Sequence, residues 1–102
     1  MHVIISEEAR RDLNDIYLFA AITCEVETAQ SLIHKMLDEI EFLQVAPDIG
    51  TWVKSIIERD TDWRFLVSHR RYLIFYKIVG DKTQVLRIMD GRTDWQKVLF
   101  KV

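Results

Sequence analysis

The sequence predicts an α+β domain in which a helical hairpin packs on one face of a small, mainly antiparallel sheet. Apolar residues recur at helical spacing before Gly50, and after it they alternate or run together as they do in strands. Helical and strand segments are also segregated along the chain, which is typical of α+β domains. The predicted order is strand–helix–helix–strand–strand–strand (β-α-α-β-β-β), and residues 1–102 are enough for a single domain.

The first half of the chain predicts a short strand and two helices. His2 to Ile5 is rich in strand-forming residues, and Ser6 is a candidate N-cap for a helix from about Glu7 to about Ile22. A polar break precedes a second helix that ends before Pro47, the only proline. Its apolar stripe consists of Ala29, Leu32, Ile33, Met36, Leu37, Ile40 and Leu43. A short link favours an antiparallel hairpin, and we expect Leu37 and Ile40 to be almost fully buried against the sheet.

The second half predicts three strands joined by tight turns. Alternation from Trp63 to Ser68 indicates a half-buried strand, whereas Tyr72 to Val79 is apolar on both faces and indicates a central strand. Gly80-Asp81 leads into a third strand, Gln84 to Met89. The tail from Thr93 to Val102 suits either a short helix or a strand. We expect the sheet face opposite the hairpin to be partly open and to carry the function.

Composition bounds the class of protein. A single cysteine, Cys24, cannot form an internal disulfide, and the N-terminus lacks the pattern of a signal peptide. The longest apolar run, Tyr72 to Tyr76, is far too short to cross a bilayer. We therefore expect a cytoplasmic protein that has no membrane partner.

The net charge of −2 conceals a polarised chain, since residues 1–50 carry −7 and residues 51–102 carry +5. One interpretation of this distribution is a basic face that binds an anionic partner. The other is that the predicted helices are rich in acids and the predicted strands in arginine, with no binding role. The sequence does not decide between these two interpretations.

Metal, cofactor and nucleophile signals are weak. The histidines are scattered, no cysteine or histidine pair has ligand spacing, and the three glycines sit in predicted turns, so we expect no metal and no cofactor. A triad built from Ser68, His69 and an aspartate is possible in any chain of this composition, so we discount it. Cys24 is interpreted as a packed, small apolar residue rather than a nucleophile.

Arginines in the predicted sheet and its turns are the better candidates for function. Guanidinium groups on strands can bind phosphate or carboxylate groups in a fixed geometry. For Arg87 we favour a structural ion pair with Asp90 or Asp94. Trp95 either closes the core or stacks on a partner, and core closure is the commoner role of such a residue.

Several segments together resemble the RelE/ParE superfamily of toxins from bacterial type II toxin–antitoxin systems. They are "EEARRDLNDIYLF", "AQSLIHKMLDEIEFLQVAPDIG", "RFLVSHRRYLIFYKI" and "VLRIMDGRTDW", in this order over nearly the whole chain. The resemblance implies a growth-arresting toxin held inactive by a cognate antitoxin, part of which folds as it wraps the toxin. It also implies contact with operator DNA only through the antitoxin complex.

The superfamily has two main activities. RelE-like members cut mRNA on the ribosome without a metal; of the basic and tyrosine positions in their pattern, this chain keeps Arg64. Leu66, Leu73, Thr93 and Leu99 stand at the other positions, with Arg92 or His69 as the candidate substitutes. Leucine can neither stabilise a phosphorane nor move a proton.

ParE-like members poison DNA gyrase and end in R-[VI]-x-H-G-x-x-D, which "RIMDGRTDW" approaches with Asp90 in place of the histidine. We favour the ParE-like branch, with gyrase as target, over a RelE-like endonuclease acting on ribosome and mRNA, or a decayed toxin that binds only its antitoxin. The candidate target-binding residues are Arg64, His69, Arg70, Arg71, Arg87, Asp90, Arg92 and Trp95.

Overall fold

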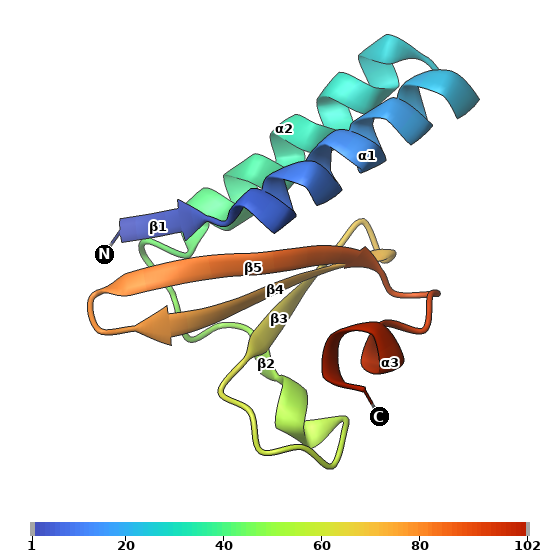
Figure 1. The fold of residues 1–102 in the computed structure, drawn as a ribbon. Helices are drawn as coiled ribbons and strands as arrows, with labels where there is room; N and C mark the ends of the chain where they lie inside the picture. The colour runs from blue at the N-terminus through green and yellow to red at the C-terminus, as the bar shows by residue number, and fades with distance from the viewer. Residues whose placement is uncertain (1, 102) are drawn as a thin grey trace.

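The α+β architecture is confirmed in a computed structural model that describes residues 2–101 (Figure 1). The two long helices lie together on one side of the sheet, and a short C-terminal helix lies on the other side. The elements are β1 (His2–Ile5), α1 (Glu7–Thr23), α2 (Val26–Phe42), β2 (Thr51–Trp52), the 3₁₀ helix η1 (Val53–Ser55), β3 (Arg64–Ser68), β4 (Tyr72–Val79), β5 (Lys82–Asp90) and α3 (Trp95–Phe100).

The described strands form one mixed sheet in the order β1-β5-β4-β3-β2. β1 runs parallel to β5, and the other neighbours are antiparallel, as the two predicted hairpins require. The predicted boundaries of the helices and of the central strand hold to within a few residues. Short β2 and η1 were not predicted, and the tail forms a helix rather than a strand.

Local sequence fixes the start of α1. The Ser6 side chain accepts a hydrogen bond from the Ala9 amide, and Glu7 and Glu8 lie where the helix dipole favours acids. The Ser6 hydroxyl also donates to the Leu86 carbonyl at 2.9 Å. One residue therefore caps the helix and ties it to β5.

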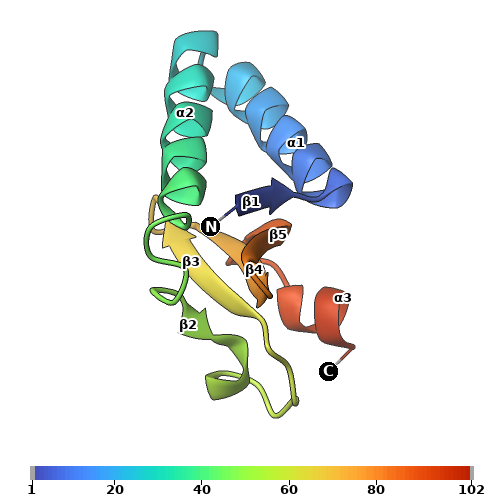
Figure 2. The same cartoon turned by 90° about the vertical axis from the view of Figure 1, so that its left-hand side faces the viewer.

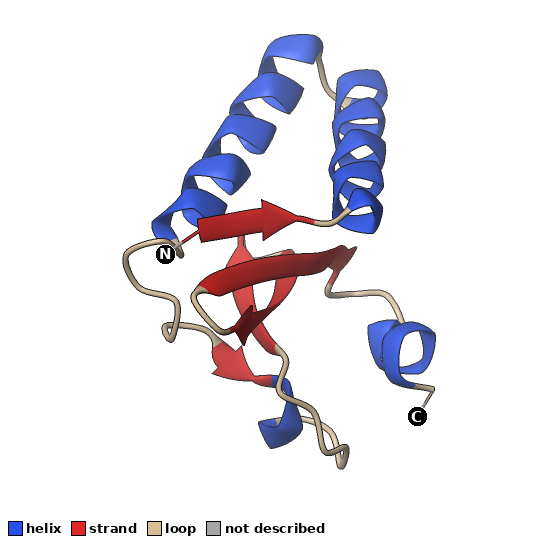
Figure 3. Cartoon of the chain, turned by 60° about the vertical axis from the view of Figure 1, so that its left-hand side comes forward, coloured by secondary structure: helices blue, strands red, loops and turns tan. Residues whose placement is uncertain are grey.

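Two hydrophobic cores lie on the two faces of the sheet. Met36, Ile40 and Leu43 of α2 and its C-terminus pack with Ile74 and Tyr76 of β4 beneath the hairpin (Figure 2). The opposite face holds a second core of Val53, Ile57, Leu73, Phe75 and Trp95. Figure 3 shows α3 and the segment after β2 on this side of the sheet. The expectation of a partly open face is therefore wrong, because the tail and the segment 53–63 cover it.

Two burial predictions are also wrong. Leu37 is 38 % exposed although Ile40 is 2 % exposed. A step of one residue turns about 100° around a helix, so Leu37 points away from the sheet that its neighbour Met36 contacts. Cys24, expected to be packed, is exposed at the C-terminus of α1, where the chain leaves the helix before α2 begins.

Ile40→Ala should lower the free energy of unfolding by about 2–5 kcal/mol, because it removes a buried side chain from the first core. Leu37→Ala, on the same helix, should cost less than about 1 kcal/mol because much of that side chain already contacts water. Urea denaturation of both variants measures the difference. Equal costs at the two positions would contradict the packing described for α2.

Candidate arginine site at one end of the sheet

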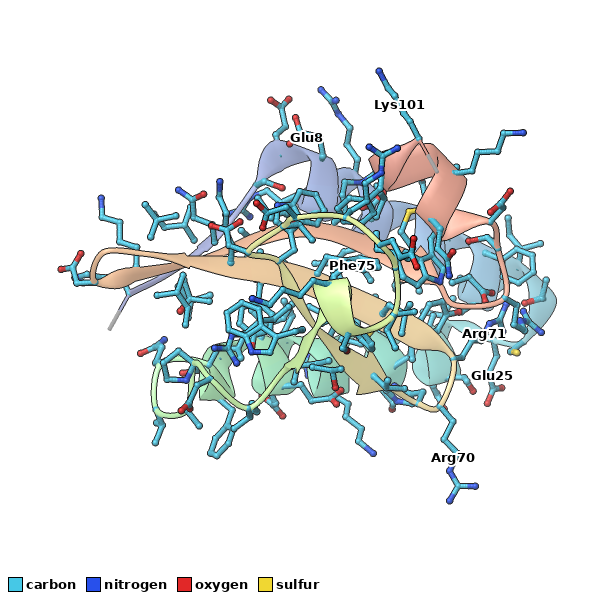
Figure 4. All side chains as sticks on the ribbon, turned by 90° about the horizontal axis from the view of Figure 1, so that it is seen from below. Glu8, Glu25, Arg70, Arg71, Phe75 and Lys101 are labelled. Atoms are coloured by element: carbon cyan, nitrogen blue, oxygen red, sulfur yellow. The ribbon has the colours of Figure 1, made fainter. Side chains whose placement is uncertain are left out.

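Five of the eight candidate residues meet where the β3–β4 turn approaches the end of β5. We call them the arginine cluster: His69, Arg70, Arg71, Asp90 and Arg92. Strand register brings the two segments together, since Tyr72 pairs with Asp90 and the Gly91 amide donates to the Arg71 carbonyl at 2.7 Å. His69 and Arg70 have φ angles of 54° and 55°, which places them in the left-handed region of a tight turn. Figure 4 shows Arg70 extending away from the body of the protein.

Asp90 organises the cluster. Its carboxylate accepts Arg71 Nε at 2.9 Å, Arg92 Nη2 at 2.9 Å and Arg92 Nε at 3.1 Å, and it also accepts the Arg92 amide. The hydrogen bond from Arg92, above all, holds the pKa of Asp90 well below its usual range. The same bond raises the pKa of Arg92. One carboxylate therefore fixes two guanidinium groups, while Arg92 remains 70 % exposed.

Three candidates lie apart from this cluster. Arg64 stacks on Trp52, with its guanidinium carbon 3.7 Å from the ring centroid, and donates to the Asp48 carbonyl. Trp95 is 7 % exposed, and its ring centroid lies 5.2 Å from that of Phe75, so this side chain closes the second core.

The expected partners of Arg87 are wrong. Arg87 Nε donates to Asp12 Oδ2 at 2.8 Å, and the same oxygen accepts the Ile88 amide. This hydrogen bond raises the pKa of Arg87. The ion pair, predicted to brace the C-terminal turn, instead joins α1 to β5. Asp12 was missed because nothing in its local sequence identifies a partner 75 residues away.

Ser68 forms a contact that sequence reasoning discounted. Its buried hydroxyl donates to Glu39 Oε1 at 2.6 Å and lies 2.8 Å from His69 Nδ1. The serine sits between the two other groups, whereas a hydrolytic triad needs histidine in the middle. The geometry therefore ties the β3–β4 turn to α2 and supplies no activated nucleophile.

A family comparison identifies the chain. Residues 3–95 match the model of the ParE toxin of the type II toxin-antitoxin system parDE. The chain belongs to the ParE toxin family. It is also similar in fold to a solved structure described as the chromosomal ParDE TA system from P. aeruginosa. The TM-score is 0.75 at 22 % identity, covering 88 % of this chain and 95 % of that one. No curated protein matches.

Of the four positions compared with RelE-like enzymes, three hold leucines that pack in the cores, and Thr93 is exposed. Leu66 contacts the first core, Leu73 is 9 % exposed, and Leu99 contacts the second core. Among residues 2–101, no three His, Cys, Asp or Glu side chains are placed to hold a metal ion. No helix in this described part is long and apolar enough to cross a membrane.

Asp90→Asn should lower the free energy of unfolding at pH 7 by about 1–2 kcal/mol, because it removes the charge from the hydrogen bonds to two arginines. The folded pKa of Asp90 is lowered, so this stabilisation is present above the unfolded pKa of about 3.9 and is lost as pH falls below it.

The gap between wild type and variant should therefore narrow between about pH 5 and pH 2. Urea titrations at several pH values measure it, with Asp94→Asn, an exposed aspartate that makes no side-chain cap, as the control. A gap that stays constant with pH would show that the charge of Asp90 does not stabilise the fold.

Proposed function

We propose that this ParE family toxin arrests growth by binding DNA gyrase, with the arginine cluster as a contact surface and without catalysis of its own. The family match over residues 3–95 carries this proposal. The cluster supports it because Arg70 and Arg92 are exposed on a turn and a strand end that the sheet holds in place. Arg70, Arg71 and Arg92 outnumber Asp90, so the cluster suits an acidic surface of a partner.

The loss of RelE-like chemistry also supports a binding role. Leu66, Leu73 and Leu99 serve the two cores and have no group to activate a 2′-hydroxyl or neutralise a phosphorane. The two other candidates for that chemistry, His69 and Arg92, are hydrogen-bonded to Ser68 and to Asp90.

We also propose that a cognate antitoxin covers an apolar groove beside β3. The groove has a volume of about 440 Å³, and its walls include Phe42, Ile49 and Val67, each roughly half exposed. β2 pairs only with Arg64 and Phe65, so the outer edge of β3 beyond Phe65 has no described strand neighbour. An exposed apolar groove beside an open strand edge favours a segment that orders as it binds. Operator DNA would then be contacted through the antitoxin.

Arg70→Ala combined with Arg92→Ala should relieve growth arrest by at least about tenfold in plating efficiency without unfolding the domain, because both side chains are exposed. Purified wild-type protein should inhibit gyrase supercoiling, and the double variant should not.

Arg87→Ala is the contrasting variant, since loss of its ion pair with Asp12 should act through stability and lower the melting temperature. In a translation reaction followed by primer extension, we expect no cuts in the message. Codon-positioned cuts would place the chain among the endonucleases. Folded wild-type protein that inhibits neither process would indicate a decayed toxin.

Val67→Lys should weaken neutralisation by the cognate antitoxin, because it places a charged side chain in the apolar part of the groove. Val98→Lys, on α3 and similarly exposed, is the matched control and should leave neutralisation unchanged. Co-expression and titration calorimetry measure both, and added salt should weaken the wild-type complex. Equal effects of the two substitutions would place the antitoxin elsewhere.

A further inference from the structure

A cleft separate from the apolar groove opens between the helical hairpin and the arginine cluster. It has two lobes, with volumes of about 340 and about 260 Å³, which share Phe19, Arg71 and Tyr72. The first lobe is also lined by Asp15, Ile16 and Asp90, and the second by residues that include Leu32 and His69. We call this the hairpin cleft. Its walls are mostly apolar, and one arginine stands where the lobes meet.

Arg71 is held in the cleft in a fixed position. Its guanidinium carbon lies 5.9 Å from the Phe19 ring centroid and 5.1 Å from that of Tyr72. Nε donates to Asp90, which is the one side-chain hydrogen bond of this guanidinium within residues 2–101. The side chain is 36 % exposed, so its terminal amino groups remain for a ligand. An arginine already oriented by rings and a carboxylate loses less side-chain entropy on binding.

His69 faces the same lobe in a defined tautomer. The Ser68 hydroxyl has one hydrogen and donates it to Glu39, so the bond to His69 Nδ1 requires that Nδ1 carries a hydrogen and donates to Ser68. Nε2 is then the remaining ring nitrogen. It donates to an anion only when the ring carries a second hydrogen, so Arg71 is the donor that is present in either form of the ring.

Local charge selects the kind of anion. Two carboxylates, Asp15 and Asp90, line the first lobe together with Arg71, whereas the residues lining the second lobe include Arg71 and no carboxylate. An anion is therefore favoured in the second lobe, and a single arginine that already bonds to Asp90 suits one singly charged carboxylate better than a phosphate dianion or a polyanionic backbone. The apolar walls formed by Ile16, Phe19 and Leu32 suit an adjacent apolar side chain.

We propose that the hairpin cleft binds a segment of a partner protein in which a carboxylate side chain lies next to an apolar one. Arg71 binds the carboxylate in the second lobe, beside His69, and Phe19 forms the wall for the apolar side chain. The inference rests on the proposed function only in treating the arginine cluster as a contact surface. It does not depend on which protein is the target.

The test is NMR titration of the ¹⁵N-labelled full chain, made by cell-free synthesis, with acetyl-Phe-Glu-amide. Acetyl-Phe-Gln-amide is the uncharged control, and phenyl phosphate is the dianionic alternative. We expect the glutamate peptide to shift the amides of Phe19, Cys24 and Arg71 and to bind at least about fivefold more tightly than the glutamine peptide at low salt. Equal binding of the two peptides, or tighter binding of phenyl phosphate, would overturn the proposal.

Variants locate the site. Arg71→Gln and Phe19→Ser should each weaken binding of the glutamate peptide about fivefold or more, whereas Lys97→Gln, an exposed cation on α3, should have no effect. Phe19 is 54 % exposed, so its variant keeps the fold even if Arg71→Gln is destabilised. Shifts confined to the groove at Phe42 and Val67 would contradict the assignment. The peptide titration uses neither gyrase nor living cells. A negative result would therefore contradict the cleft proposal and leave the proposed function to be tested by the gyrase and growth experiments.

Discussion

Burial of β4 on both faces is the constraint on which the rest of the structure depends. Ile74 and Tyr76 point into the first core, and Leu73 and Phe75 point into the second, so each face needs its own cover. The Tyr76 hydroxyl forms two hydrogen bonds with the loop after α2. It donates to the Pro47 carbonyl and accepts from the Gly50 amide, both at 2.8 Å. Burial raises the pKa of this hydroxyl. A side chain at Gly50 would collide with it, so the strand and the loop after α2 fix each other.

The sequence predicted features that depend on neighbouring residues and missed features that depend on contacts between distant parts of the chain. Capping at Ser6, the break at Pro47 and the apolar run of β4 are local, so the elements were predicted well. The cover of the second face comes from α3 and the segment 53–63, whose contacts with β4 carry no local pattern. The arginine cluster depends on the register that pairs Tyr72 with Asp90, which turn residues alone do not reveal.

The five candidate arginines differ in what holds them. Arg87 and Arg64 are used within the fold, on Asp12 and on Trp52. Arg71 and Arg92 share one aspartate, and Arg70 extends from the turn. Three of the five candidate arginines therefore gather at one end of the sheet. Near it lies the hairpin cleft, while the groove beside β3 lies against α2, so two partners need not compete for one surface.

The parallel pairing of β1 with β5 has a consequence for synthesis of the chain. His2 to Ile5 pair with Lys82 to Val85, and Asp12 accepts a hydrogen bond from Arg87. Both contacts join the first residues of the chain to its last strand. A chain emerging from the ribosome cannot close its first core until its last strand has left the exit tunnel, because such long-range contacts form late. The first core of the nascent chain therefore stays incomplete through most of its translation.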